Sequence, residues 1–208
     1  MKKYLLLIAM IAFTGIFIAC NTNKPTKTIE NLTSAFNGES TASAKYAAFA
    51  DRAKAEGFDT VAIMFRATSK AEAIHAENHK KILAKLGVVI DKPTLGKFEV
   101  KTTQENLLDA IKGEDYEIST MYPDFIKTAG IEKSPDAIKS FTWAWDTEKK
   151  HKDFYQKAFD CISKTSGEKL LPAEWYVCPI CGNTYDIGSV KEACDFCMTP
   201  KSKFVEFK

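Results

Sequence analysis

An internal repeat constrains this chain more than any other feature of its sequence. Residues 28–39 read TIENLTSAFNGE and residues 103–114 read TQENLLDAIKGE, so Glu39 and Glu114 occupy the same place in the two copies. The shared letters include polar residues that a buried core does not require. A duplicated segment of this kind is a supersecondary unit used twice.

The repeat continues, at nearly the same offset, into pairs of glutamate and histidine. The matching residues are Tyr46, Glu72 and His75 in the first copy and Tyr122, Glu148 and His151 in the second. Residues three apart share one face of a helix, so each Glu-x-x-His pair presents both side chains to the same side. The chain has three histidines, and two of them fall in these pairs. We infer a duplicated helix pair that carries metal ligands.

Four long helices are predicted, each of about 30 residues and about 45 Å. The expected spans are Thr28 to Glu56, Asp59 to Leu86, Thr102 to Gly130, and Ser134 to Gly167, with a glycine at or after each stop. Thr102 and Glu105 fit a capping box, and Ser134 before Pro135 fits a helix start. Short turns within each pair and a crossover from Val88 to Lys101 predict an all-α, ferritin-like four-helix bundle.

The ligand set of a di-iron centre matches the residues of this bundle. Such a centre takes one Glu from each of two helices and a Glu-x-x-His from each of the other two. The chain offers Glu39, Glu72, His75, Glu114, Glu148 and His151. Carboxylate and imidazole suit iron or manganese, and without metal so many buried acids would repel each other. For the further pair Glu114 and Glu117, the alternative is a solvated acidic face.

A second cluster of possible ligands lies near the end of the chain. Cys178 and Cys181 form one Cys-x-x-Cys pair, Cys194 and Cys197 form another, and twelve residues separate the pairs. This spacing is typical of a metal site with four thiolates, and both iron and zinc accept such ligands. A pair of disulfides is the alternative in an exported protein.

The first residues are typical of an export signal. A basic start is followed by an apolar run from Tyr4 to Ala19, which is about 24 Å long as a helix and short for a bilayer core of about 30 Å. Residues 17–20 resemble a lipobox, which predicts a signal peptide over 1–20, lipidation of Cys20 and a tether over 21–27. We expect a protein anchored by lipid on the periplasmic or outer side of a bacterial membrane. Ordinary secretion and an uncleaved anchor are the alternatives.

Residues from about Thr28 to Phe207 resemble the rubrerythrin family. The resemblance rests on the Gly-Glu of the first and third helices, both Glu-x-x-His pairs, residues 121–123 (Met-Tyr-Pro), and a terminal module similar to rubredoxin around the four cysteines. It implies a di-iron bundle over 28–166, a linker over 167–174 and a rubredoxin-like domain over 175–208. Asp195 and Met198 depart from the usual pattern of that domain, where proline and a small residue are common.

Site roles follow from this resemblance. Glu72 and Glu148 would bridge two irons with an oxygen between them, and Glu39 and Glu114 would be terminal ligands. Glu117 and His75 would exchange at one iron as its oxidation state changes. Tyr46 and Tyr122 would donate hydrogen bonds to the carboxylate ligands and take part in catalysis. The alternative is that both are packed core tyrosines. His79, one turn beyond His75, is expected to be a surface residue or a support for the ligands, and the alternative is a ligand of an extra metal.

The implied activity is reduction of hydrogen peroxide to water, which protects against oxidative stress. Electrons would enter singly through iron at the four cysteines from a rubredoxin, a reductase or a cytochrome, and export favours a donor in the envelope. The family resemblance also implies a head-to-tail homodimer, in which the cysteine site of one subunit lies near the di-iron site of the other. A net charge of +2 gives no reason to expect nucleic acid. A ferroxidase and a non-catalytic scaffold with zinc at the cysteines are the alternatives.

Overall fold

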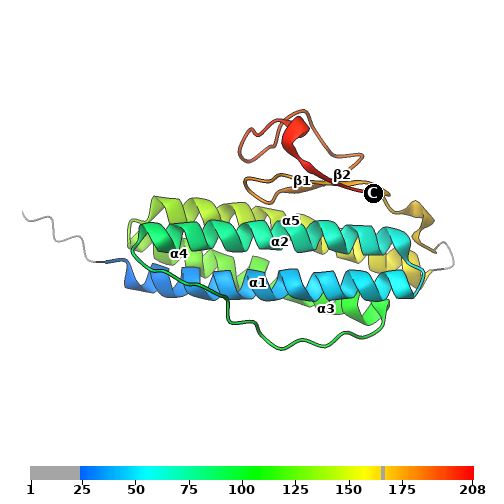
Figure 1. Ribbon diagram of the computed structural model, residues 1–208, viewed down its shortest axis with the longest axis horizontal. Coiled ribbons are helices and arrows are strands. Elements are labelled where there is room, and N and C mark those ends of the chain that lie inside the picture. The colour runs from blue at the N-terminus through cyan, green and yellow to red at the C-terminus, as the bar shows by residue number, and fades with distance from the viewer. Residues whose placement is uncertain (1–23, 165–166) are drawn as a thin grey trace, which may run out of the picture.

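Long helices arranged side by side make up most of this chain, and a small sheet covers one side of them (Figure 1). This computed structural model describes residues 24–164 and 167–208. The helices are α1 (Thr26–Ala55), α2 (Asp59–Lys85), α3 (Thr103–Tyr116), α4 (Tyr122–Ile131) and α5 (Pro135–Ser163), and the π-helical segment η1 (Glu117–Met121) joins α3 to α4. Because α3, η1 and α4 form one continuous rod, the predicted four-helix bundle is confirmed.

The first helix pair ends as the glycines predict. Gly57 and Gly87 follow α1 and α2 with φ of +82° and +77°, the left-handed conformation that favours glycine. Thr102 and Glu105 form the predicted capping box at the start of α3.

The glycines do not end the third and fourth helices as predicted, although the third helix ends only one residue beyond its predicted end. Gly130 lies inside α4, which continues to Ile131, and Lys133 takes the left-handed conformation with φ of +54°. The fourth helix ends at Ser163, before Gly167. Glycine is permissive at a helix end but does not by itself terminate a helix, since tertiary packing overrides local preference.

The third rod is interrupted where the two copies of the repeat differ by one residue. Glu39 and Tyr46 are seven apart, whereas Glu114 and Tyr122 are eight apart. In an uninterrupted α-helix the extra residue would turn Tyr122 by about 100° away from the interior. The wider turn of η1 absorbs it, so Tyr122 is fully buried like its counterpart. The prediction of one unbroken α-helix was wrong at this point.

Two glutamates at helix ends connect the helix pairs reciprocally. Glu56, directly after α1, accepts a bond from the Thr103 amide at the start of α3, with 2.8 Å between the atoms. Glu132, directly after α4, accepts bonds from the amides of Thr28 (2.7 Å) and Lys27 (3.1 Å) at the start of α1. Each carboxylate thus satisfies amides that a helix leaves unpaired and meets the positive end of its dipole.

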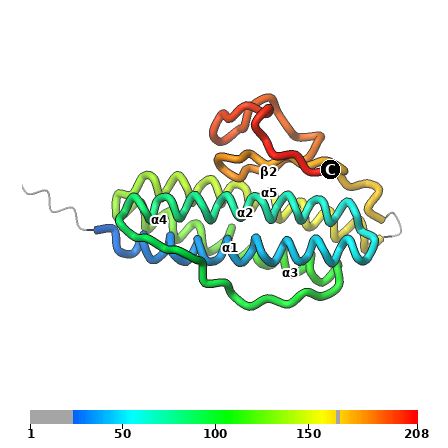
Figure 2. Tube along the Cα trace, in the orientation of Figure 1, coloured from blue at the N-terminus to red at the C-terminus, as the bar shows by residue number. Residues whose placement is uncertain are grey.

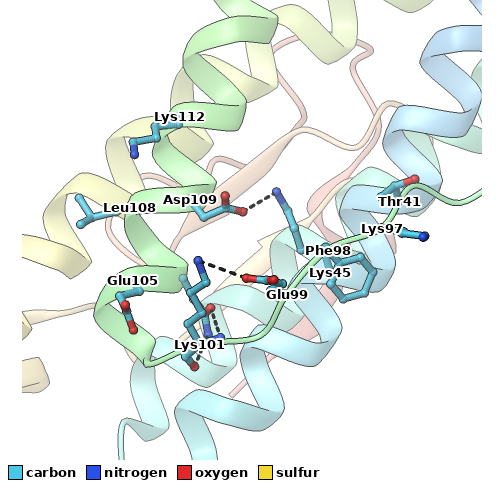
Figure 3. A pocket seen from close by; sticks show the side chains of 11 residues that line it. Thr41, Lys45, Lys97, Phe98, Glu99, Lys101, Glu105, Leu108, Asp109 and Lys112 are labelled. Atoms are coloured by element: carbon cyan, nitrogen blue, oxygen red, sulfur yellow. Dashed lines mark hydrogen bonds and ion pairs between the residues drawn. The ribbon is translucent and has the colours of Figure 1, made fainter.

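The crossover between the pairs runs along α1 before it enters α3 (Figure 2). Asn37 and Thr41 of α1 hold it by accepting bonds from the amides of Thr94 and Gly96, each 2.9 Å long. A surface hollow of about 530 Å³ lies between the crossover, α1 and α3 (Figure 3). Its walls carry the Lys45 pair with Asp109 and contain none of the predicted metal ligands.

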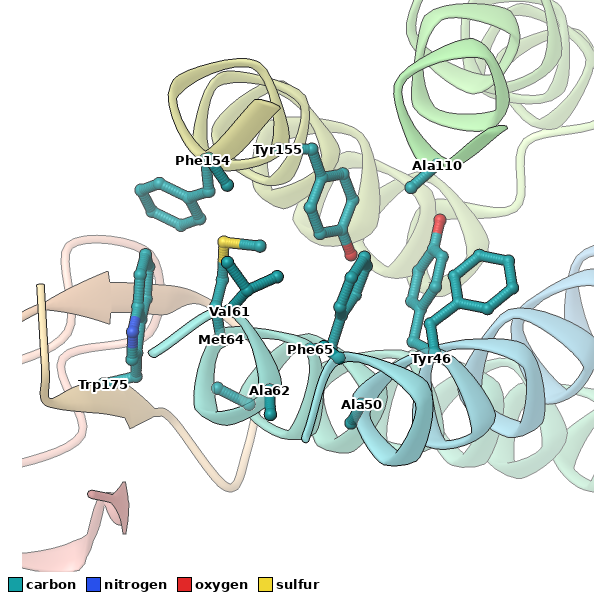
Figure 4. Packing of buried hydrophobic residues seen from close by; sticks show 14 of the residues in the cluster. Tyr46, Ala50, Val61, Ala62, Met64, Phe65, Ala110, Phe154, Tyr155 and Trp175 are labelled. Atoms are coloured by element: carbon teal, nitrogen blue, oxygen red, sulfur yellow. The ribbon is translucent and has the colours of Figure 1, made fainter. Parts of the chain in front are cut away.

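The four cysteines belong to a small module built around three strands. These are β1 (Trp175–Val177), β2 (Thr184–Asp186) and β3 (Val205–Phe207), in the antiparallel order β2-β1-β3. Trp175 is buried in the same core cluster as Val61, Phe65 and Phe154 of the bundle (Figure 4). The module therefore shares a hydrophobic core with the helices. Within the part of the chain described, no helix is both long and apolar enough to span a membrane.

Candidate metal centres

Six predicted ligands meet in the interior of the bundle. Glu39 lies on α1, Glu72 and His75 on α2, Glu114 on α3, and Glu148 and His151 on α5. All six are at most 2% exposed. They form two groups whose ligand atoms lie within 4.8 Å of one another: Glu39, Glu72, His75 and Glu148, and then Glu72, Glu114, Glu148 and His151.

Two of these carboxylates, Glu72 and Glu148, belong to both groups, and their oxygens are divided between the two histidines. The Nδ1 atom of His75 lies 3.0 Å from one oxygen of Glu72 and 3.0 Å from one oxygen of Glu148. The Nδ1 atom of His151 lies 3.0 Å and 2.7 Å from the opposite oxygens. Each carboxylate therefore spans both groups, which is the geometry of a bridging ligand.

The chemistry of this cluster fits a pair of cations. Within the described chain, one oxygen of Glu72, both of Glu148 and the Nδ1 atom of His151 are buried without a hydrogen bond, although they lie close together. Burial, and then repulsion from Glu148 and Glu72, raises the pKa of Glu39 and of Glu114 well above the usual range. Cations between these groups would satisfy the unpaired atoms and relieve the repulsion. Oxygen and imidazole donors suit iron or manganese.

The two predicted tyrosines bond to the outer carboxylates, each across the bundle. The hydroxyl of Tyr46 on α1 donates to Glu114 on α3 at 2.5 Å, and the hydroxyl of Tyr122 on α4 donates to Glu39 on α1. Both rings are buried. The structure therefore has both tyrosines beside the carboxylates, as predicted, while their part in catalysis stays a prediction.

Glu117 lies on the π-helical segment and is half-buried. Among the described residues it is outside both ligand groups. Burial, and then the negative charges of Glu39 and Glu114, raises its pKa well above the usual range, so its carboxyl group lies in the field of the cluster. Its role as an exchanging ligand stays a prediction.

His79 is fully buried, so it is not a surface residue, and it lies beside the residues that bond the ligands. Its Nε2 atom lies 3.3 Å from the Tyr122 hydroxyl and its Nδ1 atom lies 2.9 Å from the Ser140 hydroxyl. Burial, and then the charge of His75, lowers the pKa of His79 to about 3, so the ring is neutral. The place of His79 one turn after His75 was a signal for this role. No sequence signal indicated Ser140.

The four cysteines meet in the module as the spacing predicts. The sulfur of Cys178 lies 3.5 Å from that of Cys197, and the sulfur of Cys181 lies 3.4 Å from that of Cys194. A disulfide is about 2.05 Å long, so all four are free thiols and the alternative of two disulfides was wrong. Four convergent sulfurs are the ligand set of a closed metal site and could hold one ion.

Each Cys-x-x-Cys pair and the residue after it form a tight turn, called a knuckle here. The two knuckles, 178–182 and 194–198, have the same backbone turn but end in different residues. The amide of Gly182 donates to the Cys178 carbonyl at 3.0 Å, and the amide of Met198 donates to the Cys194 carbonyl at 2.9 Å. Both residues are left-handed, with φ of +82° and +60°. The departure at Met198 therefore leaves the turn intact, at a cost of about 1–2 kcal/mol for a non-glycine residue.

The module lies directly on the histidines of its own bundle. A Cβ atom added to Gly182 would overlap the Nε2 atom of His75 and approach the Ala71 carbonyl to 3.2 Å. The hydroxyl of Thr184 lies 2.9 Å from the Nε2 atom of His151. The resemblance implied this proximity between two subunits, whereas here one chain provides it.

Fold and site together define a ferritin-like metal-binding bundle with an attached four-cysteine module. A family profile described as Rubrerythrin matches residues 30–159. Nigerythrin of Nitratidesulfovibrio vulgaris is 36% identical over 180 residues, which cover 86% of each chain. Rubrerythrin-2 of Clostridium acetobutylicum is 31% identical over 186 residues, covering 88% of this chain and 98% of that protein. The chain belongs to the rubrerythrin family.

Solved structures agree with this assignment. A nigerythrin structure described as fully reduced and all ferrous has a TM-score of 0.77 and 35% identity, and the match covers 86% of each chain. A bacterioferritin of Desulfovibrio desulfuricans has a TM-score of 0.65 at 20% identity, which shows a shared fold alone. Rubrerythrins are di-iron oxidoreductases, and the Glu/His cluster and four cysteines of this chain fit that family.

Proposed function

We propose that this protein is a peroxidase that reduces hydrogen peroxide to water at a di-iron centre and thereby protects against oxidative stress. Cys178, Cys181, Cys194 and Cys197 would hold a single iron, which would supply the route by which electrons enter. The observation that carries the proposal is the seating of Gly182 against His75, because it places the four-cysteine site beside the Glu/His cluster.

The residues of the bundle have distinct tasks in this proposal. Glu72 and Glu148, which belong to both ligand groups, would hold both ions, and Glu39 and Glu114 would each hold one. When bound, a ferrous pair supplies the two electrons that cleave the O–O bond of peroxide. Tyr46 and Tyr122 donate hydrogen bonds to Glu114 and Glu39 and so fix the orientation of these two carboxylates toward the ions.

The module supplies electrons through its contacts with the Nε2 atoms of His75 and His151, which face away from the carboxylates. His75 and His151 direct Nδ1 toward the carboxylates and Nε2 toward the module. A closed set of four thiolates changes little in geometry on electron transfer, whereas the carboxylate-rich cluster is able to open for substrate. The division of labour between the two sites follows from their ligands.

Location, donor and assembly belong to the same proposal. Residues 1–20 and Cys20 lie outside the described residues, and the lipobox-like sequence supports a lipid-anchored protein of the bacterial envelope. The electron donor is then a rubredoxin, reductase or cytochrome reachable from that side. A homodimer is proposed from the resemblance, although a single chain already brings its two metal sites together.

Stopped-flow mixing of the fully reduced protein with peroxide and with oxygen tests the activity. We expect oxidation by peroxide to be the faster reaction and the red colour of a ferric thiolate site to appear in the same turnover. Cys197→Ser removes one thiolate and abolishes the colour, whereas Cys161→Ser changes a free cysteine outside the tetrad and leaves it unchanged. Faster oxidation by oxygen would indicate a ferroxidase. A colourless, zinc-containing module would indicate a scaffold.

A further inference from the structure

A chain of hydrogen bonds leads outward from Glu39. The Tyr122 hydroxyl donates to the Glu39 carboxylate, so its oxygen is free to accept from the Nε2 atom of His79 at 3.3 Å. The Nδ1 atom of the neutral imidazole is then the acceptor for the Ser140 hydroxyl at 2.9 Å. With Tyr122 donating to Glu39, every donor in this chain points inward, toward the metal cluster.

The outer end of the chain reaches the protein surface between α2 and α5. Ser140 lines a hollow of about 220 Å³ there, together with Asn78, Lys85, Asp136 and Lys139. Lys85 and Asp136 form a 2.7 Å ion pair at its rim, and both side chains are more than half exposed. Tyr122, His79 and Ser140 are themselves at most 4% exposed. The hydrogen-bond chain therefore spans the layer that separates solvent from the cluster.

Among the described residues, the other half of the repeat has no matching chain of hydrogen bonds. Tyr46 is the counterpart of Tyr122, and Tyr155, four residues after His151, stands where His79 stands after His75. The ring of Tyr155 packs against Tyr46 and Phe65 with centroids 5.4 Å and 5.3 Å apart (Figure 4). Phe49 and Met64 belong to the same buried cluster. On this side Tyr46 packs against apolar core on one face and has the Lys45 ammonium 5.3 Å from its ring centroid, and its hydroxyl bonds Glu114 without a histidine or serine that continues the chain.

We propose that Ser140, His79 and Tyr122 form a one-sided proton conduit from the α2–α5 hollow to the Glu39 side of the metal cluster. The inference rests on the proposed peroxidase function, in which one peroxide takes up two electrons and two protons to give two waters. For each proton moved, Ser140 passes its hydrogen to Nδ1 of His79 and takes one from water. His79 passes the Nε2 hydrogen to Tyr122, which passes its own inward. The ring, which now carries its hydrogen on Nδ1, returns to the Nε2 form before the second proton follows. Solvent supplies the protons, and no other reactant is consumed.

The first test follows the protons without turnover. The chain has three histidines, so nitrogen NMR of the full-length protein loaded with zinc resolves each ring. We expect the His79 ring to carry its proton on Nε2 and to exchange it with deuterated water at least about tenfold more slowly in Ser140→Ala. Tyr155→Phe removes a hydroxyl from the other half and leaves the exchange unchanged. A proton on Nδ1, or equal exchange in all three proteins, overturns the conduit.

The second test uses the iron-loaded protein in a single turnover with peroxide. His79→Phe keeps an aromatic ring beside Tyr122 and Phe141 but removes both nitrogens. We expect oxidation to slow at least about tenfold, since positioned proton transfer contributes about 10²–10⁴ in rate, and the solvent isotope effect to rise. Rates within twofold of the parent overturn the proposal. If the parent itself does not react with peroxide, the proposed function fails while the exchange test still judges the conduit.

Discussion

At the scale of single residues, the contrast between Gly182 and Met198 shows how neighbouring atoms decide whether a position has room for a side chain. Both end a knuckle with a left-handed backbone, and the turn alone would favour glycine at either place. Met198 is 73% exposed, so its side chain has space, whereas any Cβ at Gly182 meets His75. Glycine is required where the module touches the bundle, and the backbone strain is tolerated elsewhere.

This difference predicts the result of adding one methyl group. Gly57→Ala and Gly182→Ala both place alanine at φ of +82°, but only Gly182 faces a neighbouring side chain within 4 Å. We expect Gly57→Ala to lose about 1–2 kcal/mol of unfolding free energy from strain, and Gly182→Ala to lose about 1–3 kcal/mol more from overpacking. Denaturant titration measures both. Equal losses would mean that the module does not press on His75.

At the scale of elements, the repeated helix pairs are bonded to each other by the same device used twice. Glu56 and Glu132 stand after corresponding helices and bind the first amides of α3 and α1. The hydrogen bond with Thr28, which is the largest contribution, lowers the pKa of Glu132 below its usual 4.5. Because the folded pKa is depressed, the stabilisation is complete above pH 4.5 and disappears as the pH falls through the lowered value.

Glu132→Gln tests this contact. We expect a loss of about 1 kcal/mol at neutral pH, typical of a lost helix cap, and a difference from the parent that vanishes in acid. Glu77→Gln, on the exposed surface of α2, is the matched control and should change little at any pH. Unfolding free energies measured from pH 7 to pH 3 give the comparison. A constant difference across that range would contradict a charge-dependent cap.

At the scale of the whole molecule, the bundle and the module form one packed unit. The Trp175 ring meets Phe154 edge to face with centroids 4.7 Å apart. Polar bonds join the module to the bundle elsewhere: the Asn78 amide donates to the Ile180 carbonyl at 2.8 Å, and Lys150 donates to Asn183 at 2.7 Å. The module has three short strands, so its metal is expected to supply much of its folding energy.

Removal of that metal should therefore affect the helices beneath the module. In a Cys161→Ser background, a thiol-binding mercurial strips the four-cysteine site. We expect amide hydrogen exchange to rise throughout residues 175–207 and in the segment of α2 around His75, because a buried face becomes exposed there. The start of α1, where Glu132 accepts from the Thr28 amide, lies at the opposite end of the helix from the residues in the Trp175 cluster and is the internal control. Unchanged exchange in α2 would show that the bundle does not depend on the module.

Much of the candidate site could be read from the sequence, because local spacing encodes it. Glu72 and His75 are three apart on one helix, and the repeat places the same pair at Glu148 and His151. Cys-x-x-Cys pairs likewise fix which sulfurs converge. The one-residue difference between the copies was also visible, and it marks the π-helical segment that carries Glu117.

What the sequence by itself determined was therefore the helical rods, their duplication and the residue types that face inward, since these follow from periodicity along the chain. Only the tertiary structure decided that Gly182 rests on His75, that Glu132 caps α1, and that His79 connects Tyr122 to Ser140. These contacts join residues from 43 to 107 positions apart. No local pattern records such a distance, because the packing of separate elements sets it.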